Sequence, residues 1–175
     1  MPNWIQGSLK VRGPYDYVKR FLLEGLNVYH DEFNKETNRF ESHVLPKTDW
    51  LEDAHEYDEK LGREFSMYIK AGKWIYVEGT QRAFITSDYI SCYEGSNEKD
   101  PLAIVSCEVR QAWGFRPEDW VEISKDYQVD IRLYGFERGL EFGEEIEIVD
   151  GEVIKNEEFT YDNWDWECPF PWFGG

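Results

Sequence analysis

Residues Trp4–Arg12 read WIQGSLKVR, and the chain continues through Gly13-Pro14 into YDYVKRFLLEG at Tyr15–Gly25. Apolar and polar residues alternate over the first segment, which is typical of a strand with one buried face. Pro14 suits the first turn of a helix, and apolar residues then recur at helical spacing as far as Gly25, a common helix stop. We therefore predict a strand, a turn and a helix at the start of the chain.

A similar order returns in the second half of the chain. Leu102–Trp113 is a long strand candidate, rich in β-branched residues. Arg116-Pro117-Glu118-Asp119 predicts the start of a helix, because proline and acidic residues favour the first turn. We expect this helix to reach Tyr127 and a further strand to alternate from Val129 to Leu133.

The chain is expected to close with a hairpin. Asp150-Gly151 is a strong two-residue turn signal between strands over 140–149 and 152–159. Two strand–helix units that place two helices on one face of an antiparallel sheet describe a ferredoxin-like α+β sandwich. We predict a single ferredoxin-like domain over 1–160, with an inserted strand-rich region at about 40–100 and an aromatic, acidic C-terminal tail at 161–175.

The inserted region gives weaker local signals. Aromatic and β-branched residues predict strands over 40–45, 65–69, 74–77 and 83–93. Residues 49–62 are expected to form a short acidic helix with an uneven apolar stripe. Its acidic residues would line one helix face, at Asp49, Glu52, Asp53, Glu56 and Glu59.

Two segments of the chain, over roughly 1–25 and 102–155, hold a recognisable set of residues. These are Pro2-Asn3-Trp4 with the following strand and Gly13, Ala112-Trp113-Gly114-Phe115-Arg116-Pro117, and Leu133-Tyr134-Gly135-Phe136-Glu137-Arg138-Gly139-Leu140-Glu141-Phe142. On these residues the chain resembles the YubB ferredoxin-like domain family. The family usually has a Cys after the Trp; Ile5 stands there in this chain, so no thiol role is expected at that place. The resemblance implies a ferredoxin-like fold in a protein carried by a phage, prophage or plasmid, and it implies no reaction.

Negative charge is concentrated near the C-terminus. The chain has 36 acidic against 19 basic residues, a net charge of −17, and residues 137–175 alone hold 12 acidic and two basic residues. A small domain needs a net charge of only about 2–8 for solubility. Concentrated like charge destabilises the compact state through self-repulsion, so we expect a cationic partner to offset it. The same charge makes direct nucleic-acid binding unlikely, because phosphates would be repelled.

The terminal hairpin is the first candidate binding site. Acidic residues two positions apart on a strand share a face at a spacing of about 6–7 Å, similar to the spacing of phosphates along a DNA strand. A solvated, solubilising face is the alternative interpretation of such a row. The candidate carboxylates are Glu141, Glu144, Glu145, Glu147, Asp150 and Glu152.

The C-terminal tail is the second candidate. Aromatic residues alternate with acidic ones there, and Pro169 and Pro171 prevent a regular helix or central strand. The rings either pack back onto the sheet or form an exposed patch for a partner. The candidate contact residues are Asp162, Trp164, Asp165, Trp166, Glu167 and Trp172.

These features predict a non-enzymatic phage or prophage protein of the bacterial cytoplasm. We expect it to bind and inhibit a basic host protein that handles nucleic acid, such as a CRISPR effector nuclease (a Cas nuclease), by imitating nucleic acid. One alternative is a small enzyme or ligand-binding protein with a cleft between the sheet and the insertion. A second is a nucleic-acid binder with aromatic residues on the sheet face, which would require one face to hold Trp4, Lys10, Arg12, Arg110 and Arg132.

The sequence holds no recognisable catalytic, cofactor or metal motif. His30, His43 and His55 lack metal-ligand spacing, the tail acids fail the EF-hand pattern, and no cofactor is expected. The three cysteines form no CxxC pair and are expected to be buried or incidental thiols. No apolar run reaches the roughly 20 residues of a membrane helix, and residues 1–13 lack the apolar core of a signal peptide.

Overall fold

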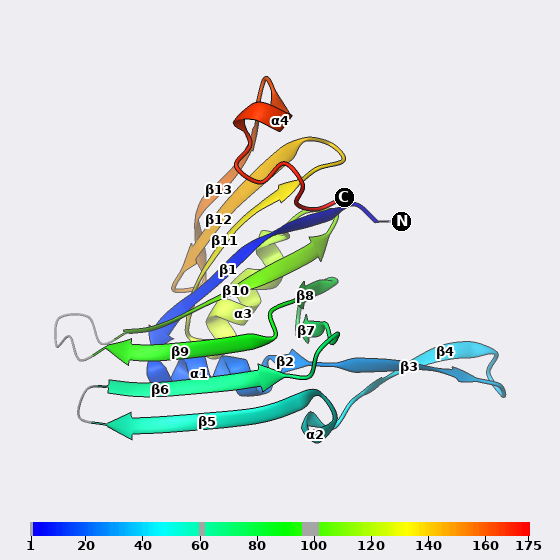
Figure 1. The fold of residues 1–175 in the computed structure, drawn as a ribbon, viewed down its shortest axis with the longest axis vertical. Helices are drawn as coiled ribbons and strands as arrows, with labels where there is room; N and C mark the ends of the chain where they lie inside the picture. The colour runs from blue at the N-terminus through cyan, green and yellow to red at the C-terminus, as the bar shows by residue number, and fades with distance from the viewer. Residues whose placement is uncertain (1, 60–61, 96–101) are drawn as a thin grey trace.

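The computed structural model describes residues 2–59, 62–95 and 102–175 and has a mixed α+β fold (Figure 1). Within these residues, eleven strands form one antiparallel sheet and two further strands form a separate hairpin. Helices α1 and α3 lie behind the sheet in the view of Figure 1. None of the helices in the described ranges is long and apolar enough to cross a membrane.

The opening of the chain folds as predicted. Strand β1 spans Trp4–Pro14 and helix α1 spans Tyr15–Glu24. The buried side of β1 holds its apolar residues, while Lys10 and Arg12 are exposed on the other side. The helix ends at Gly25, whose backbone N–H donates to the carbonyl of Phe21.

Strand β1 lies at the centre of the sheet. It pairs antiparallel with β10 (Leu102–Ala112) on one side and with β11 (Asp130–Glu137) on the other. Helix α3 (Pro117–Tyr127) connects these two neighbours, as the sequence predicts. Gly7 allows β1 and β11 to approach closely, since a Cβ there would lie 2.0 Å from the carbonyl oxygen of Tyr134.

The terminal hairpin is also confirmed. Strands β12 (Phe142–Val149) and β13 (Glu152–Thr160) extend the sheet beyond β11. Asp150 and Gly151 have φ values of 52° and 74°. A two-residue hairpin turn of type I′ requires positive φ at both positions, so these residue types account for the tight connection.

The insertion adds most of the remaining strands, and the sheet divides at β10. The N-terminal half of β10 pairs with β9 and the C-terminal half with β8, so the single strand expected over 83–93 is in fact two. The hairpin β3–β4 projects away from the sheet (Figure 1). The elements are β2 (Leu26–Asn27), β3 (Tyr29–Asn34), β4 (Arg39–Val44), α2 (Lys47–Trp50), β5 (Leu51–Glu59), β6 (Gly62–Ile69), β7 (Ile75–Val77), β8 (Ala83–Ile85) and β9 (Tyr89–Gly95).

The acidic helix expected over 49–62 is wrong. Only α2 is helical there, and the chain then becomes β5, which pairs with β6 along its length. Residues 60 and 61 of the expected helix lie outside the described residues. An irregular pattern of apolar residues is compatible with a helix or with a strand at the edge of a sheet, and pairing with β6 selects the strand. The acidic helix face formed by Asp49, Glu52, Asp53, Glu56 and Glu59 therefore does not exist.

The main core lies between the sheet and the two helices. Helix α1 buries Val18, Phe21 and Leu22, and α3 buries Trp120 and Ile123. The opposite face of the sheet carries neither α1 nor α3, and we call it the open face. Only its end over β11–β13 is covered, by the C-terminal tail with the short helix α4 (Trp164–Glu167).

Candidate functional site

The terminal-hairpin carboxylates do not form one exposed row. Glu145 points to the open face, but its side chain is only 12% exposed. Its carboxylate is held by Arg132, with Nη2 2.5 Å from Oε1, and by Lys155, with Nζ 2.7 Å from Oε2. Burial favours the neutral acid, yet hydrogen bonds from Lys155 and Arg132 outweigh it and lower the pKa of Glu145. This charge is already balanced within the chain.

Glu144 lies on the opposite side of β12. Its Oε2 accepts a hydrogen bond of 2.6 Å from the backbone N–H of Phe115, just before α3. Burial raises the pKa of the Glu144 carboxyl. The residue therefore ties the hairpin to the start of α3 and is turned away from the open face.

The other four hairpin acids are spread over different places. Glu147 follows Glu145 on the same face of β12 and lines a cleft of about 150 Å³ together with Lys10, Arg12 and Arg132. Glu141 precedes β12 in a turn at φ 58°, and Asp150 occupies the turn before β13. Glu141, Asp150 and Glu152 are exposed. Glu145 and Glu147 share one face of β12, as their spacing predicts. The row is incomplete, because Glu141 lies in the turn before β12 and Glu145 is paired with Arg132 and Lys155.

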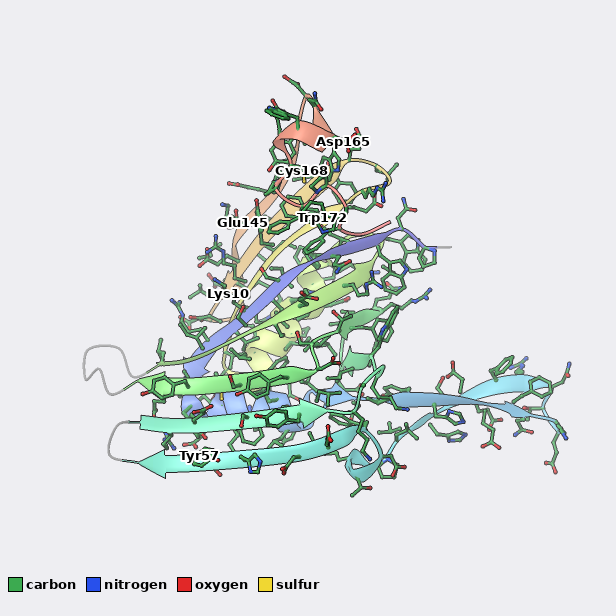
Figure 2. The ribbon with its side chains drawn as sticks, in the orientation of Figure 1. Lys10, Tyr57, Glu145, Asp165, Cys168 and Trp172 are labelled. Atoms are coloured by element: carbon green, nitrogen blue, oxygen red, sulfur yellow. The ribbon has the colours of Figure 1, made fainter. Side chains whose placement is uncertain are left out.

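The tail residues also divide into two groups. Trp164 is 4% exposed and packs with Phe136 and Cys168, so it belongs to a small second core. Trp166 and Trp172 are 85% and 62% exposed and stay available to a partner. The acidic tail residues Asp162, Asp165 and Glu167 are exposed. Figure 2 shows this segment above the sheet, with Asp165, Cys168 and Trp172 labelled.

The open face carries a group of tyrosines that sequence reasoning did not single out. Strand pairing places Tyr57 opposite Glu64, Glu64 opposite Tyr93, and Tyr93 opposite Ile104, across four neighbouring strands. Tyr57 and Tyr93 are 54% and 51% exposed. Figure 2 shows Tyr57 on β5, at the far edge of the sheet from the acidic hairpin.

A second row lies beside the first. Tyr68 on β6 pairs with Tyr89 on β9, their ring centres are 4.8 Å apart, and both are exposed. On β5, Asp53 is the partner of Tyr68. We call Tyr57, Tyr68, Tyr89 and Tyr93 the tyrosine surface. Its charged neighbours in the paired strands, Asp53 and Glu64, are acidic.

A second feature of the open face is a stack of arginine and tryptophan side chains beside the ends of the neighbouring strands β1, β10 and β8. The Arg110 guanidinium lies 5.0 Å from the Trp74 ring centre and 5.7 Å from that of Trp4. Arg82 lies 5.5 Å from Trp4 and 5.3 Å from Trp113. We call these five residues the arginine–tryptophan stack. These tryptophans and arginines are far apart in the sequence. The order of the strands in the sheet brings them together, so the sequence alone does not reveal the stack.

The five side chains that the nucleic-acid alternative requires on one face of the sheet do share a face. Trp4, Lys10 and Arg12 alternate on β1 with its buried residues. Arg110 pairs opposite Gln6, and Arg132 pairs opposite Lys10. The five side chains therefore share the open face, interspersed with carboxylates such as Glu108 and Glu147.

The enzyme alternative gains little from the histidines. His30 and His43 pair with each other in the projecting β3–β4 hairpin, whereas His55 lies on β5. Over the described ranges, no group of three or more metal-ligating side chains converges. A cleft of about 690 Å³ does lie beside β7 and β8, but no histidine lines it.

The function of this chain has to be inferred from its own fold and surfaces. Neither protein-family models, nor curated proteins, nor solved structures gave a match to this chain. The resemblance to the YubB family therefore stands on the residues quoted for it and stays an expectation.

Proposed function

We propose that this protein is a non-enzymatic binding protein that docks a basic partner protein onto the open face of its sheet. The observation that carries the proposal is the tyrosine surface, an exposed aromatic group on the part of the open face that the C-terminal tail leaves uncovered. Tyrosine, tryptophan and arginine are the residue types that most often anchor protein interfaces. The tyrosine surface supplies the first of these, and the exposed Trp166 and Trp172 supply the second.

Charge favours a basic partner. The tyrosine surface is bordered by Asp53 and Glu64, and the chain as a whole carries a net charge of −17. A surface of this sign steers a cationic protein towards it and repels an acidic one. Proteins that handle nucleic acid present such basic surfaces. In the mobile-element setting that the family resemblance implies, a host nuclease in the bacterial cytoplasm, a CRISPR effector included, is the first class to test.

We also propose that the protein inhibits its partner by imitating nucleic acid. The acidic surface as a whole supports this proposal, whereas the hairpin alone does not. Glu145 is neutralised by Arg132 and Lys155, so the hairpin offers fewer free charges than the sequence suggests. Glu141, Asp150 and Glu152 remain exposed for a partner.

A ferredoxin-like core is also part of the proposal. Strand order β11–β1–β10–β9, antiparallel at each step, supports it, as do the two helices on one face. In this arrangement the open face is the natural surface for a ligand or partner, because the other face is buried by α1 and α3.

The test is a comparative capture experiment on lysate of a bacterium that carries phage-defence systems. The immobilised proteins are wild type, the double variant Tyr68→Ser/Tyr89→Ser, and the matched variant Tyr17→Ser, which removes an exposed tyrosine from α1. A fourth protein, Glu141→Gln/Glu152→Gln, tests the hairpin. Bound proteins are eluted with a salt gradient and identified by mass spectrometry.

We expect wild type and Tyr17→Ser to retain the same basic protein and to release it as salt screens the charges. The double tyrosine variant should lose it, since interface anchors typically contribute about 2 kcal/mol or more each. Retention by the double tyrosine variant at the wild-type level overturns the proposed surface. Loss only with the hairpin variant would move the site to the acidic hairpin.

A further inference from the structure

We infer that the cleft beside the arginine–tryptophan stack binds a nucleoside phosphate, either as a free nucleotide or as a unit of a single strand. This inference does not rest on the proposed function, because the cleft is built from other residues than the tyrosine surface.

Aromatic rings from three strands meet at this place. Trp4 on β1 has ring centres of Trp74 and Phe84 at 6.1 and 6.0 Å. Trp74 and Phe84 are 5.8 Å apart, and Tyr76 follows at 5.6 Å from Phe84. Trp74 is 47% exposed and lines the cleft, so part of its surface is accessible there. Such rings provide stacking platforms for nucleobases, since every base has a π face.

The two arginines of the stack lie against tryptophan rings and, like Arg20, Arg39 and Arg138 among the described residues, form no ion pair with a carboxylate. Arg12, Arg63, Arg116 and Arg132 form ion pairs with carboxylates. In the part of the chain that the structure describes, neither Arg82 nor Arg110 has a carboxylate within ion-pair distance. Arg110 Nη2 donates to the side-chain oxygen of Gln6 at 3.1 Å, and its buried Nε has no hydrogen-bond partner. Uncompensated guanidinium groups against aromatic rings suit an anionic, planar ligand.

Two residues of the arginine–tryptophan stack have an unusual backbone conformation. Arg82 and Trp113 have φ values of 60° and 65°, in the left-handed region that such residues seldom adopt. Neighbouring hydrogen bonds hold both, from Ala112 N–H to the Arg82 carbonyl and from Trp113 N–H to the Asn3 carbonyl. Backbone strain of this kind clusters at binding sites, where it aims a side chain.

The cleft has the size and lining of a small-ligand site. Its volume is about 690 Å³, within the usual range of about 300–1,000 Å³ for such sites. Trp74, Tyr76 and Phe84 supply apolar walls, and Arg82 and Lys73 supply positive charge. Glu78 and Asp31 also line it.

The two carboxylates of the cleft are held by neutral donors and keep their negative charge. Glu78 Oε1 already accepts hydrogen bonds from Asn27 and Tyr29, and Asp31 accepts one from Ser42. A base stacked on Trp74 would place its phosphate near Arg82 and Lys73 and away from Glu78 and Asp31, whose carboxylates repel it. A cationic ligand is disfavoured near Arg82 and Lys73, because like charges repel.

The test is calorimetric titration of the full chain with AMP, adenosine, inorganic phosphate and a short single-stranded oligothymidylate. An arginine methyl ester serves as the cationic probe. The variants are Arg82→Gln and Trp74→Ala. The matched controls are Arg20→Gln, which removes an arginine stacked on Tyr17 and Tyr127 on the helix side, and Trp166→Ala, which removes an exposed tryptophan from α4. Circular dichroism verifies that each variant is folded.

We expect AMP to bind at least tenfold more tightly than adenosine or phosphate alone, and each site variant to weaken AMP binding at least tenfold. The controls should bind as wild type does. Tighter binding of the oligothymidylate than of AMP assigns the site to a strand, and the reverse order assigns it to a free nucleotide; both support the shared chemistry. Failure of AMP and of the oligonucleotide to bind overturns the inference, as does AMP binding that survives both site variants. Binding of the arginine ester alone also overturns it and would indicate a cage for a basic side chain.

Discussion

Glu145 and Lys155 form an ion pair between β12 and β13, with Oε2 and Nζ 2.7 Å apart. Arg132 on β11 contacts the other oxygen of the same carboxylate. The three side chains thus connect three strands on the open face. Their arrangement explains why the most acidic part of the sequence is not simply an exposed row of negative charge.

Replacing Glu145 with Gln should lower the free energy of unfolding at pH 7 by about 1–3 kcal/mol, because it leaves two cations without their carboxylate. The pKa of Glu145 is lowered in the folded protein, since Lys155 and Arg132 outweigh the effect of burial. A lowered native pKa contributes stability above the unfolded-state value of about 4.3, and this is lost as the pH falls through the native value. Urea unfolding of both proteins from pH 7 downwards should show the difference shrinking below about pH 4.

The control for Glu145 is Glu152→Gln, which changes an exposed acid at the start of β13 and should stay within about 0.5 kcal/mol of wild type. An equal effect of the two substitutions would contradict a specific role of the ion pairs.

Gly7→Ala should prevent stable folding, or lower the free energy of unfolding by more than about 4 kcal/mol. A Cβ at Gly7 would lie 2.0 Å from the Tyr134 carbonyl oxygen and 2.4 Å from the Gly135 Cα, both backbone atoms that cannot move aside. Gly72→Ala is the comparison, since its Cβ would meet no atom within 4 Å and only the φ of 76° is strained. Its cost should be about 1–2 kcal/mol. Thermal unfolding measures both, and a stable Gly7→Ala protein would show that β1 and β11 pair differently.

Trp164→Ala should cost about 3 kcal/mol in unfolding free energy, the usual loss for a large buried aromatic. Trp166→Ala, two residues away, should change it by less than about 0.5 kcal/mol. The contrast arises because Trp164 is 4% exposed beside Phe136, whereas Trp166 is 85% exposed. Chemical denaturation checks both values. Equal losses would mean that the tail does not pack on the sheet as described.

The three thiols should react slowly with a disulfide reagent in the native protein at pH 8 and readily after unfolding. Burial raises the pKa of Cys92 to about 11 and of Cys107 to about 12, and it also raises the pKa of Cys168. Little thiolate is therefore present at this pH, and the thiolate is the reacting form. Counting released chromophore against time measures the rate. A fast-reacting thiol in the native protein would identify an exposed cysteine and contradict the burial of all three.

Local sequence signals were sufficient where one element could be read without its neighbours. The alternation in Trp4–Arg12, the proline-led helix starts and the Asp150-Gly151 turn all predicted elements that the structure contains. The same approach failed over residues 49–62, where the pattern of Trp50, Leu51 and Ala54 is compatible with a helix. Strand β5 forms there because an edge of the sheet, supplied by β6, is available to pair with it.

The sequence by itself determined the excess of negative charge, the abundance of aromatic residues and the period of each main strand and helix, because these depend on residues close together in the chain. Only the tertiary structure decided which of those residues are free to bind. Glu145 meets Arg132 and Lys155, Trp164 is buried while Trp166 is not, and Trp4 meets Arg82 and Arg110, all through strand order and register. Pairing between distant segments sets these contacts, since a shift of one residue in register would turn each side chain to the opposite face.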